Sequence, residues 1–167
     1  KLKTFSIGLP GSEDLRYAKM VADHLGTDHH EVIVTEKQML QFIEKDIYQI
    51  ETYDTTTIRA SVPMFMLSHY IQAYTDVKVI YSGEGSDEAS GSYLYFHNAP
   101  TPKDFQEECV RLIKDLNRFD VLRCDKSTAG AGLEVRVPFL DKQFLEHYMS
   151  VPAEMKVPKD GMEKWFL

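Results

Sequence analysis

Short apolar runs alternate with segments of helical periodicity through the first half of this chain. The runs at residues 5–9, 31–34 and 77–81 contain β-branched or aromatic side chains and predict three strands. Between them, apolar residues recur every three to four positions, as on one face of a helix. Strands joined by helices favour an α/β fold with a parallel sheet and flanking helices. The second half is mostly helical in periodicity and shows no linker, so residues 1–167 are expected to form part of one domain.

Local signals set the expected ends of the helices. Gly26 suits a helix C-terminus, and Thr35 with Gln38 fits a capping box. Pro63 is expected in the first turn of the next helix, after a polar break at residues 53–57. The segments expected to be helical, with approximate bounds, are 12–25, 35–50, 63–74, 103–122, 141–148 and 160–167.

Composition and charge exclude several classes of protein. Apolar residues make up 43% of the chain, enough for a sizeable core without disulfides or a structural metal. The net charge of −7, with acids spread along the chain, argues against a nucleic-acid-binding face. No apolar stretch approaches the roughly 20 residues of a membrane span, and no signal-peptide pattern opens the chain. Cys109 and Cys124 form no CxxC pattern and are expected to be reduced thiols in a cytoplasmic protein.

The sharpest candidate site is the loop Ser82–Glu88, which follows the third predicted strand. Its glycines, Gly83 and Gly85, allow a tight turn and a close approach of ligand to backbone. The loop carries three carboxylates and no basic residue, so a phosphate ligand requires a bridging divalent cation. We expect Mg²⁺, with Asp87 as its ligand. The alternative is an ordinary strand-to-helix turn capped by Ser86 or Asp87, and spacing alone favours that alternative.

Two further segments place a basic side chain among groups that suit anions. Arg59 lies in a hydroxyl-rich stretch, and arginine can bind a carboxylate or phosphate with two parallel hydrogen bonds. Arg136 lies in the segment 134–138. In both segments an ordinary ion pair is the simpler interpretation. His29 and His30 are adjacent, so in a strand they point to opposite faces and cannot share one metal.

Six motifs in order resemble the synthetase domain of asparagine synthetases and together cover nearly the whole chain. The motifs are FSIGLPGS at 5–12, TTIRAS at 56–61, SGEGSDE at 82–88, YLYFH at 93–97, GLEVRVPFLD at 132–141 and MEK at 162–164. Each motif alone has modest specificity, whereas the ordered set is highly specific. The segment 93–97 in particular separates this family from its lactam-forming relatives.

The resemblance implies a fold of the ATP-pyrophosphatase type and a reaction in two steps. Aspartate attacks the α-phosphate of ATP, releasing pyrophosphate and forming β-aspartyl-AMP, and ammonia then displaces AMP to give asparagine. In the family the ammonia derives from glutamine in an N-terminal glutaminase domain. The implied ligands are therefore ATP as a substrate, Mg²⁺ as a cofactor, and aspartate with ammonia or glutamine. Nucleic acid and membrane are not expected as partners, and the full-length protein is expected to form a homodimer.

The resemblance also implies roles at the ATP end of the site. Ile7, Ser82 and Gly83 are expected to contact ATP, and Asp87 is expected to bind Mg²⁺ at the pyrophosphate. Lys164 is expected to offset the negative charge on the transferring phosphoryl group. These roles follow from matching positions in the motifs.

At the acceptor end, Glu84 is expected to handle the proton of ammonia. Arg59, together with Thr56 and Thr57, is expected near the aspartate or the ammonia. Positioning and electrostatic stabilisation are the main demands of such a reaction, because adenylation itself supplies the leaving group.

Three departures from the family pattern qualify these expectations. The family's Ser-Gly-Gly-x-Asp-Ser loop, which cradles pyrophosphate, and the glutaminase domain are both absent, and Ser92 replaces a usual glycine. The chain also opens at Lys1, close to a predicted strand. We therefore expect an excised fragment with an exposed sheet edge, which is inactive by itself. A sister amide synthetase and a nucleotide-binding module without catalysis remain as alternatives.

Overall fold

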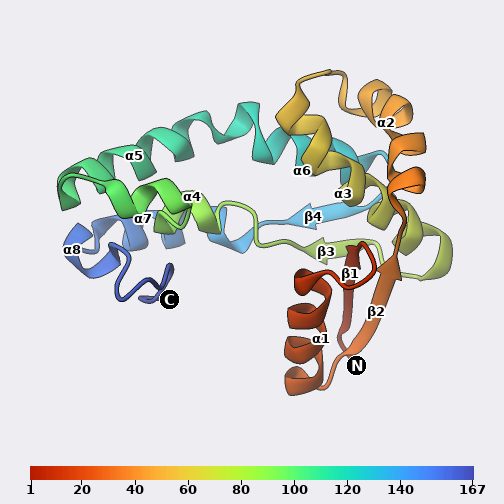
Figure 1. Cartoon of the computed structure of the whole chain (residues 1–167), viewed down its shortest axis with the longest axis horizontal. Coiled ribbons are helices and arrows are strands. Elements are labelled where there is room, and N and C mark those ends of the chain that lie inside the picture. The colour runs from red at the N-terminus through yellow and green to blue at the C-terminus, as the bar shows by residue number, and fades with distance from the viewer. The chain divides into compact units, whose positions relative to one another are not determined.

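The computed structural model describes all of residues 1–167 and divides into two compact units. The first comprises residues 1–78 and 125–134, and the second comprises residues 79–124 and 135–167. Figure 1 labels the helices and strands of both units along the chain. No helix in either unit combines the length and apolar character needed to cross a membrane.

The first unit is built on a parallel strand pair with a helix between the strands. β1 (Lys3–Gly8) pairs with β2 (Asp28–Ile33) over the full length of both strands. α1 (Glu13–Leu25) contacts both strands and buries Leu15. It ends at Gly26, whose φ of 65° is a left-handed conformation that glycine adopts without steric penalty. The predicted strand–helix–strand order in this segment is confirmed.

Two longer helices pack together in the same unit. α2 (Glu36–Ile50) begins at the predicted capping box of Thr35. α3 (Thr55–Tyr74) begins at Asp54, whose carboxylate accepts a hydrogen bond from the Thr57 amide at 2.8 Å. Between the helices lie an edge-to-face aromatic contact and a buried polar contact. These contacts pair Phe42 with Phe65 and Asp46 with Ser61.

The prediction that a helix begins at Pro63 is wrong. Pro63 lies inside α3, and the capping carboxylate of Asp54 sets the helix start at Thr55 instead. A proline interrupts one backbone hydrogen bond in a helix interior, but burial of the helix along its length outweighs that loss here. As a consequence, the motif at residues 56–61 occupies the first turns of a helix rather than a loop.

The predicted single sheet is also absent. β3 (Val79–Tyr81) pairs with β4 (Glu134–Arg136), which gives two separate two-stranded sheets. The amide of Ser82 donates to the carbonyl of Arg136 at 2.9 Å at the end of this pairing. β4 is only three residues long, and Pro138 stands two positions after its end, so its sequence carries little strand signal.

Helices and short 3₁₀ turns form the rest of the chain. They are α4 (Ser86–Ser90), η1 (Leu94–Asn98), α5 (Pro102–Asp115), η2 (Leu116–Arg118), α6 (Asp120–Ala129), η3 (Pro138–Leu140), α7 (Lys142–Ser150) and α8 (Ala153–Lys156). The core of the second unit is centred on Phe96, Phe105 and Cys109. Both cysteines of the chain are free and buried, as expected.

Two predicted helices differ in the second unit. The helix expected over residues 103–122 ends at Asp115, and Phe119 leaves the helical conformation with φ −125° and ψ −95° before α6 begins. The helix expected over residues 160–167 is a series of turns. Asp160 and Gly161 adopt φ of 51° and 75°, both left-handed, which forces a tight reversal.

Candidate active site

The loop after β3 is shaped by a glycine that no other residue could replace without strain. Gly85 has φ 88°, and a Cβ placed on it would lie 2.1 Å from a methyl carbon of Leu140. Its backbone immediately precedes α4, so Gly85 occupies the N-cap position where Ser86 or Asp87 was expected. The amide of Glu84 donates to the Ser82 hydroxyl at 3.4 Å, which closes a small turn at the start of the loop.

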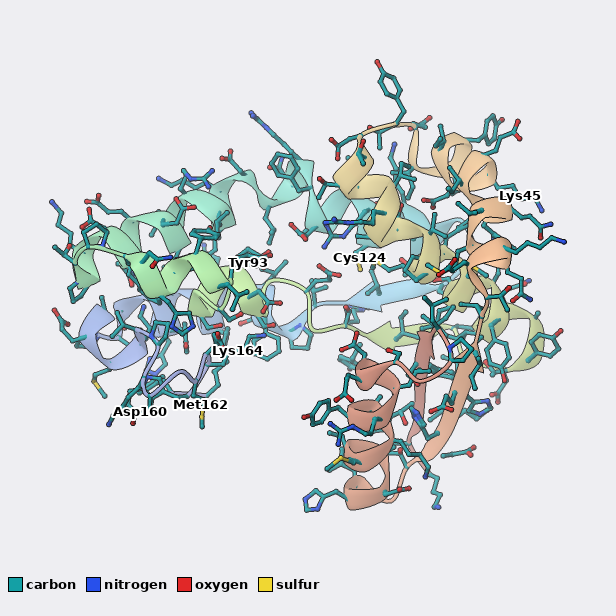
Figure 2. All side chains as sticks on the ribbon, viewed as in Figure 1. Lys45, Tyr93, Cys124, Asp160, Met162 and Lys164 are labelled. Carbon is teal, nitrogen blue, oxygen red and sulfur yellow. The ribbon has the colours of Figure 1, made fainter.

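Asp87 forms an ion pair with Lys164 at this loop. Figure 2 labels Lys164. The Lys164 ammonium lies 2.7 Å from Oδ1 of Asp87 and 3.2 Å from the hydroxyl of Ser86. The Ser92 hydroxyl donates to the same Oδ1 atom. Burial raises the pKa of Asp87, but the hydrogen bonds from Lys164 and Ser92 outweigh it and hold the pKa below its usual value. Asp87 is therefore an anion in this setting.

Ser92 does not strain the backbone at the position where the family usually has glycine. It is absent from the residues with positive φ, and its amide donates to the Asp87 carbonyl at 3.1 Å. Its hydroxyl adds a second donor to the carboxylate that Lys164 already contacts. The departure thus alters the surroundings of Asp87 rather than the path of the chain.

Glu84 lies in a buried cluster of opposing charges. Its Oε2 is 3.9 Å from the Arg123 guanidinium, which also forms an ion pair with Asp120. All three side chains are only 16–17% exposed. Burial raises the pKa of Glu84 to about 7, with Arg123 opposing the rise and Asp120 among the carboxylates that add to it. A carboxylate of this kind can accept or release a proton near neutral pH.

Sequence reasoning missed Arg123 and Asp120. They stand three residues apart on α6, a spacing that suits an ion pair on one helix face. Nothing in the sequence links that pair to Glu84, because packing alone brings α6 to the loop. The Arg123 Nε atom is buried and has no hydrogen-bond partner within the chain. This leaves unsatisfied donor capacity beside Glu84.

Glu88 extends the acidic cluster but is tied to its own neighbours. Its side chain is buried and accepts a hydrogen bond from the Tyr93 hydroxyl. Burial raises the pKa of Glu88, and the bond from Tyr93 works in the opposite direction. Tyr93, the first residue of the aromatic motif at 93–97, therefore holds the Glu88 carboxylate in place; Figure 2 labels Tyr93.

The residues present fit a magnesium ion bound together with phosphate. No group of three or more His, Cys, Asp or Glu side chains in the chain forms a metal cage. Mg²⁺ does not need one, because it is commonly held by one or two carboxylates plus substrate phosphates and water. Lys164 and Ser92 both contact Oδ1 of Asp87, and its side chain is 47% exposed, so the carboxylate can be reached by a ligand.

The other predicted site residues belong to the first unit. Ile7 lies in β1 and pairs with Val32. Thr56, Thr57 and Arg59 occupy the first turns of α3, where Thr56 and Arg59 are exposed and Thr57 is buried. Their expected contacts with ATP, aspartate or ammonia stay predictions. The structure brings Asp87 and Lys164 of the second unit together, with Ser82, Gly83 and Glu84 on the same loop.

Comparisons with known proteins agree with the motifs. The family model described as asparagine synthase matches residues 1–104 and 98–167. Similar curated proteins include the asparagine synthetases (glutamine-hydrolysing) of Gallus gallus and Rattus norvegicus, each 52% identical over 166 residues, and that of Homo sapiens, 51% identical. These alignments cover 99% of this chain and 30% of each relative, so the chain spans less than a third of their length. With a match along its whole length, the chain belongs to the asparagine synthase family.

Proposed function

We propose that this chain is part of one synthetase domain, of the ATP-pyrophosphatase type, in a cytoplasmic enzyme that makes asparagine. The enzyme would use ATP to activate aspartate as β-aspartyl-AMP and would then form the amide with ammonia drawn from glutamine. The observation that carries the proposal is the Lys164–Asp87 contact of 2.7 Å at the loop Ser82–Glu88. It puts a cation and a carboxylate, both partly exposed, beside a glycine-rich turn in a member of this family.

The charges of the loop suit the activation step. Asp87, held as an anion, would ligate Mg²⁺, and the ion would neutralise pyrophosphate oxygens when bound. The Lys164 ammonium, held beside Asp87 and the Ser86 hydroxyl, would contact the transferring phosphoryl group from that position. Ser82 and Gly83 would contact ATP through the turn that precedes Gly85, and Ile7 would contact its adenosine portion. Fixed charges of this kind stabilise a transition state without rearranging during the reaction.

Glu84 suits the amide-forming step. Ammonia that attacks an acyl adenylate must lose a proton, and a buried carboxylate with a pKa of about 7 is matched to that task. Arg123, locked to Asp120, limits how far burial can raise that pKa. Arg59, Thr56 and Thr57 would bind the aspartate or receive the ammonia. Full-length protein is expected to be a homodimer, and neither nucleic acid nor membrane enters the proposal.

Substrate dependence of the full-length protein tests this proposal. We would measure release of AMP and pyrophosphate from MgATP, with and without aspartate, and asparagine formation on adding ammonium or glutamine. The proposal predicts that release requires aspartate and that asparagine appears once a nitrogen donor is present. Release that requires another carboxylic acid would identify a sister amide synthetase. A folded protein that binds ATP and releases nothing would be a non-catalytic module.

Expressing residues 1–167 alone gives a second test. Because the chain holds only part of the proposed phosphate site, it is expected to form no asparagine under the same conditions. Asparagine formation by this chain alone would contradict that expectation.

A further inference from the structure

The segment that carries Lys164 is joined to the rest of its unit by apolar contacts at its two ends, where Val157 packs against the core and Phe166 lies beside Tyr148. Residues 157–167 contain no helix, and their own hydrogen bonds are limited to turns, a bridge between Lys159 and Met162, and a bond from Trp165 Nε1 to the Val157 carbonyl at 2.8 Å. Figure 2 labels Asp160, Met162 and Lys164 along this tail. A segment of this kind does not fix a side chain by itself.

Lys164 also has an unfavourable backbone conformation. Its φ is 55°, in the left-handed region, and it is one of only three residues other than glycine with positive φ in the chain. Such a conformation costs about 1 kcal/mol or more for a residue with a Cβ atom and persists only where surrounding contacts enforce it. The contacts next to Lys164 therefore decide whether its ammonium stays on Asp87.

The neighbouring residue supplies such a contact. The Glu163 carboxylate lies 2.6 Å from Nε2 of His97, and both side chains are about 30% exposed. Because an ionised carboxylate only accepts hydrogen bonds, Nε2 carries the hydrogen and donates it. The bond from His97 lowers the pKa of Glu163, so the carboxylate is charged. A charge-assisted hydrogen bond is among the stronger contacts available to a partly exposed pair.

His97 is itself anchored to the core of the second unit. It lies in η1, directly after Phe96, which is 2% exposed and packs edge-to-face on Phe105. The His97–Glu163 bond therefore joins the tail to a fixed part of the same unit, one residue before Lys164. No other side-chain hydrogen bond or ion pair joins residues 157–163 to the body of the unit.

We propose that His97 is a positioning residue for Lys164, which acts by holding Glu163 and so keeps the Lys164 ammonium on Asp87. The inference rests on the proposed function for its kinetic consequence, since Lys164 is there the group that offsets phosphoryl charge. Its structural consequence, the docking of Lys164, is independent of any reaction.

A lysine-labelling experiment tests the docking without using activity. In the full-length protein, the rate at which an amine-reactive reagent modifies Lys164 would be followed by mass spectrometry. His97→Ala is expected to raise that rate about tenfold, because an ammonium docked on a carboxylate is protected. The rate at Lys142, which is 88% exposed on α7 and paired with Glu146, is expected to stay unchanged. Equal Lys164 rates in wild type and His97→Ala would overturn the proposal.

Matched variants separate positioning from general damage. His97→Gln keeps a donor for Glu163 and is expected to restore most of the protection. Tyr95→Phe removes a comparable bond from the same 3₁₀ turn, the 2.8 Å contact with Glu108, which does not involve the tail. It is expected to leave the Lys164 rate unchanged. A rise in Tyr95→Phe equal to that in His97→Ala would show loosening of η1 as a whole and would overturn the proposal.

Kinetics supply the second readout. His97→Ala is expected to lower kcat for aspartate-dependent pyrophosphate–ATP exchange about tenfold while KM for aspartate changes little. In the Lys164→Met variant, His97→Ala is expected to lower kcat no further, because His97 acts on the reaction only through the Lys164 ammonium. Additive losses would overturn the proposal. If the wild type shows no aspartate-dependent exchange, the proposed function fails, and the labelling rates alone still decide the role of His97.

Discussion

Glu84 illustrates how much of the candidate chemistry depends on the surroundings of one side chain. In water a glutamate is ionised well below neutrality, whereas burial here raises the pKa of Glu84 to about 7. Arg123 lies 3.9 Å away and opposes that rise, while carboxylates nearby support it. The same side chain on an exposed loop would be ionised at neutral pH but a weaker base, with little driving force to accept a proton.

The first prediction concerns the pH dependence that Glu84 confers. As a base it must be ionised, so at fixed free-ammonia concentration the rate of asparagine formation is expected to rise with pH through about 7 and then level. Glu84→Gln is expected to abolish that limb and lower the rate about 10²–10⁴-fold, with ATP binding retained. Amide synthesis at the wild-type rate in this variant would remove Glu84 from the mechanism.

The contribution of Glu84 to stability changes with pH in the direction opposite to the rate. Its folded-state pKa of about 7 exceeds the ordinary value of 4.5, so the folded state holds an additional proton between these values. The contribution of this group to the unfolding free energy therefore falls as pH rises through that window. Melting temperatures of wild type and Glu84→Gln across the window check the sign, because the variant lacks this titration.

Ser92 permits a second prediction at the same scale. Its hydroxyl donates to Asp87, and its backbone has no strain that a glycine would relieve. Ser92→Gly is expected to lower aspartate-dependent pyrophosphate release by no more than about 150-fold, because Lys164 still contacts the same carboxylate oxygen and one hydrogen bond to a charged group contributes about 1.5–3 kcal/mol at most. A complete loss of release would mean that the serine hydroxyl itself takes part in the reaction.

Some side chains of the candidate site could be predicted from the sequence, and others could not. Asp87 and Lys164 could be named from short motifs, and the structure brings them to 2.7 Å although 77 positions separate them. Arg123 and Asp120 could not, because their sequence shows only a helical ion pair. Their relevance arises from the packing of α6 beside Glu84, which is a tertiary event that no local pattern encodes.

At the level of elements, the prolines of two helices, Pro102 in α5 and Pro63 in α3, make the clearest contrast. Pro102 lies at the first turn of α5, where a proline fits, and Thr101 caps that helix. Pro63 lies inside α3, where it removes a backbone hydrogen bond. Capping by Asp54 explains why α3 nevertheless begins at Thr55, a start that the proline signal at position 63 concealed.

Substitutions at the two prolines are expected to act in opposite directions. Pro63→Ala restores a backbone donor and is expected to raise the unfolding free energy by about 1–2 kcal/mol, after allowing for the greater freedom of the unfolded chain. Pro102→Ala gains no hydrogen bond and is expected to lower it by about 0.5 kcal/mol. Thermal melts of both variants measure the difference. A loss of stability in Pro63→Ala would contradict this prediction and show that α3 depends on the proline itself.

Element boundaries were predictable where capping chemistry is explicit. The capping box of Thr35 and the terminal Gly26 both appear as expected. The conformation of the tail at residues 160–167 was not predictable in this way, because the sequence suggested a helix whereas Asp160 and Gly161 turn the chain. The break between α5 and α6 falls at Phe119, whose φ of −125° and ψ of −95° interrupt the helix within a continuous apolar periodicity.

For the molecule as a whole, the residues to which the family motifs give roles are divided between the two compact units. Ile7, Thr56, Thr57 and Arg59 come from the first unit, and the loop Ser82–Glu88 with Lys164 comes from the second. Family membership supports a shared purpose for these residues, because the match runs along the entire chain. The chain spans 30% of the length of its relatives, so the activity is a property to test in the full-length protein.

The central claim is that the loop Ser82–Glu88 and Lys164 carry the activation of aspartate. Pyrophosphate–ATP exchange in the full-length protein, without any nitrogen donor, measures that step alone. We expect the wild-type exchange to require both aspartate and Mg²⁺. In Lys164→Met the exchange rate is expected to fall about 10²–10³-fold, whereas Lys142→Met is expected to exchange at the wild-type rate. Undiminished exchange in Lys164→Met, in a protein that exchanges with aspartate, would contradict the claim.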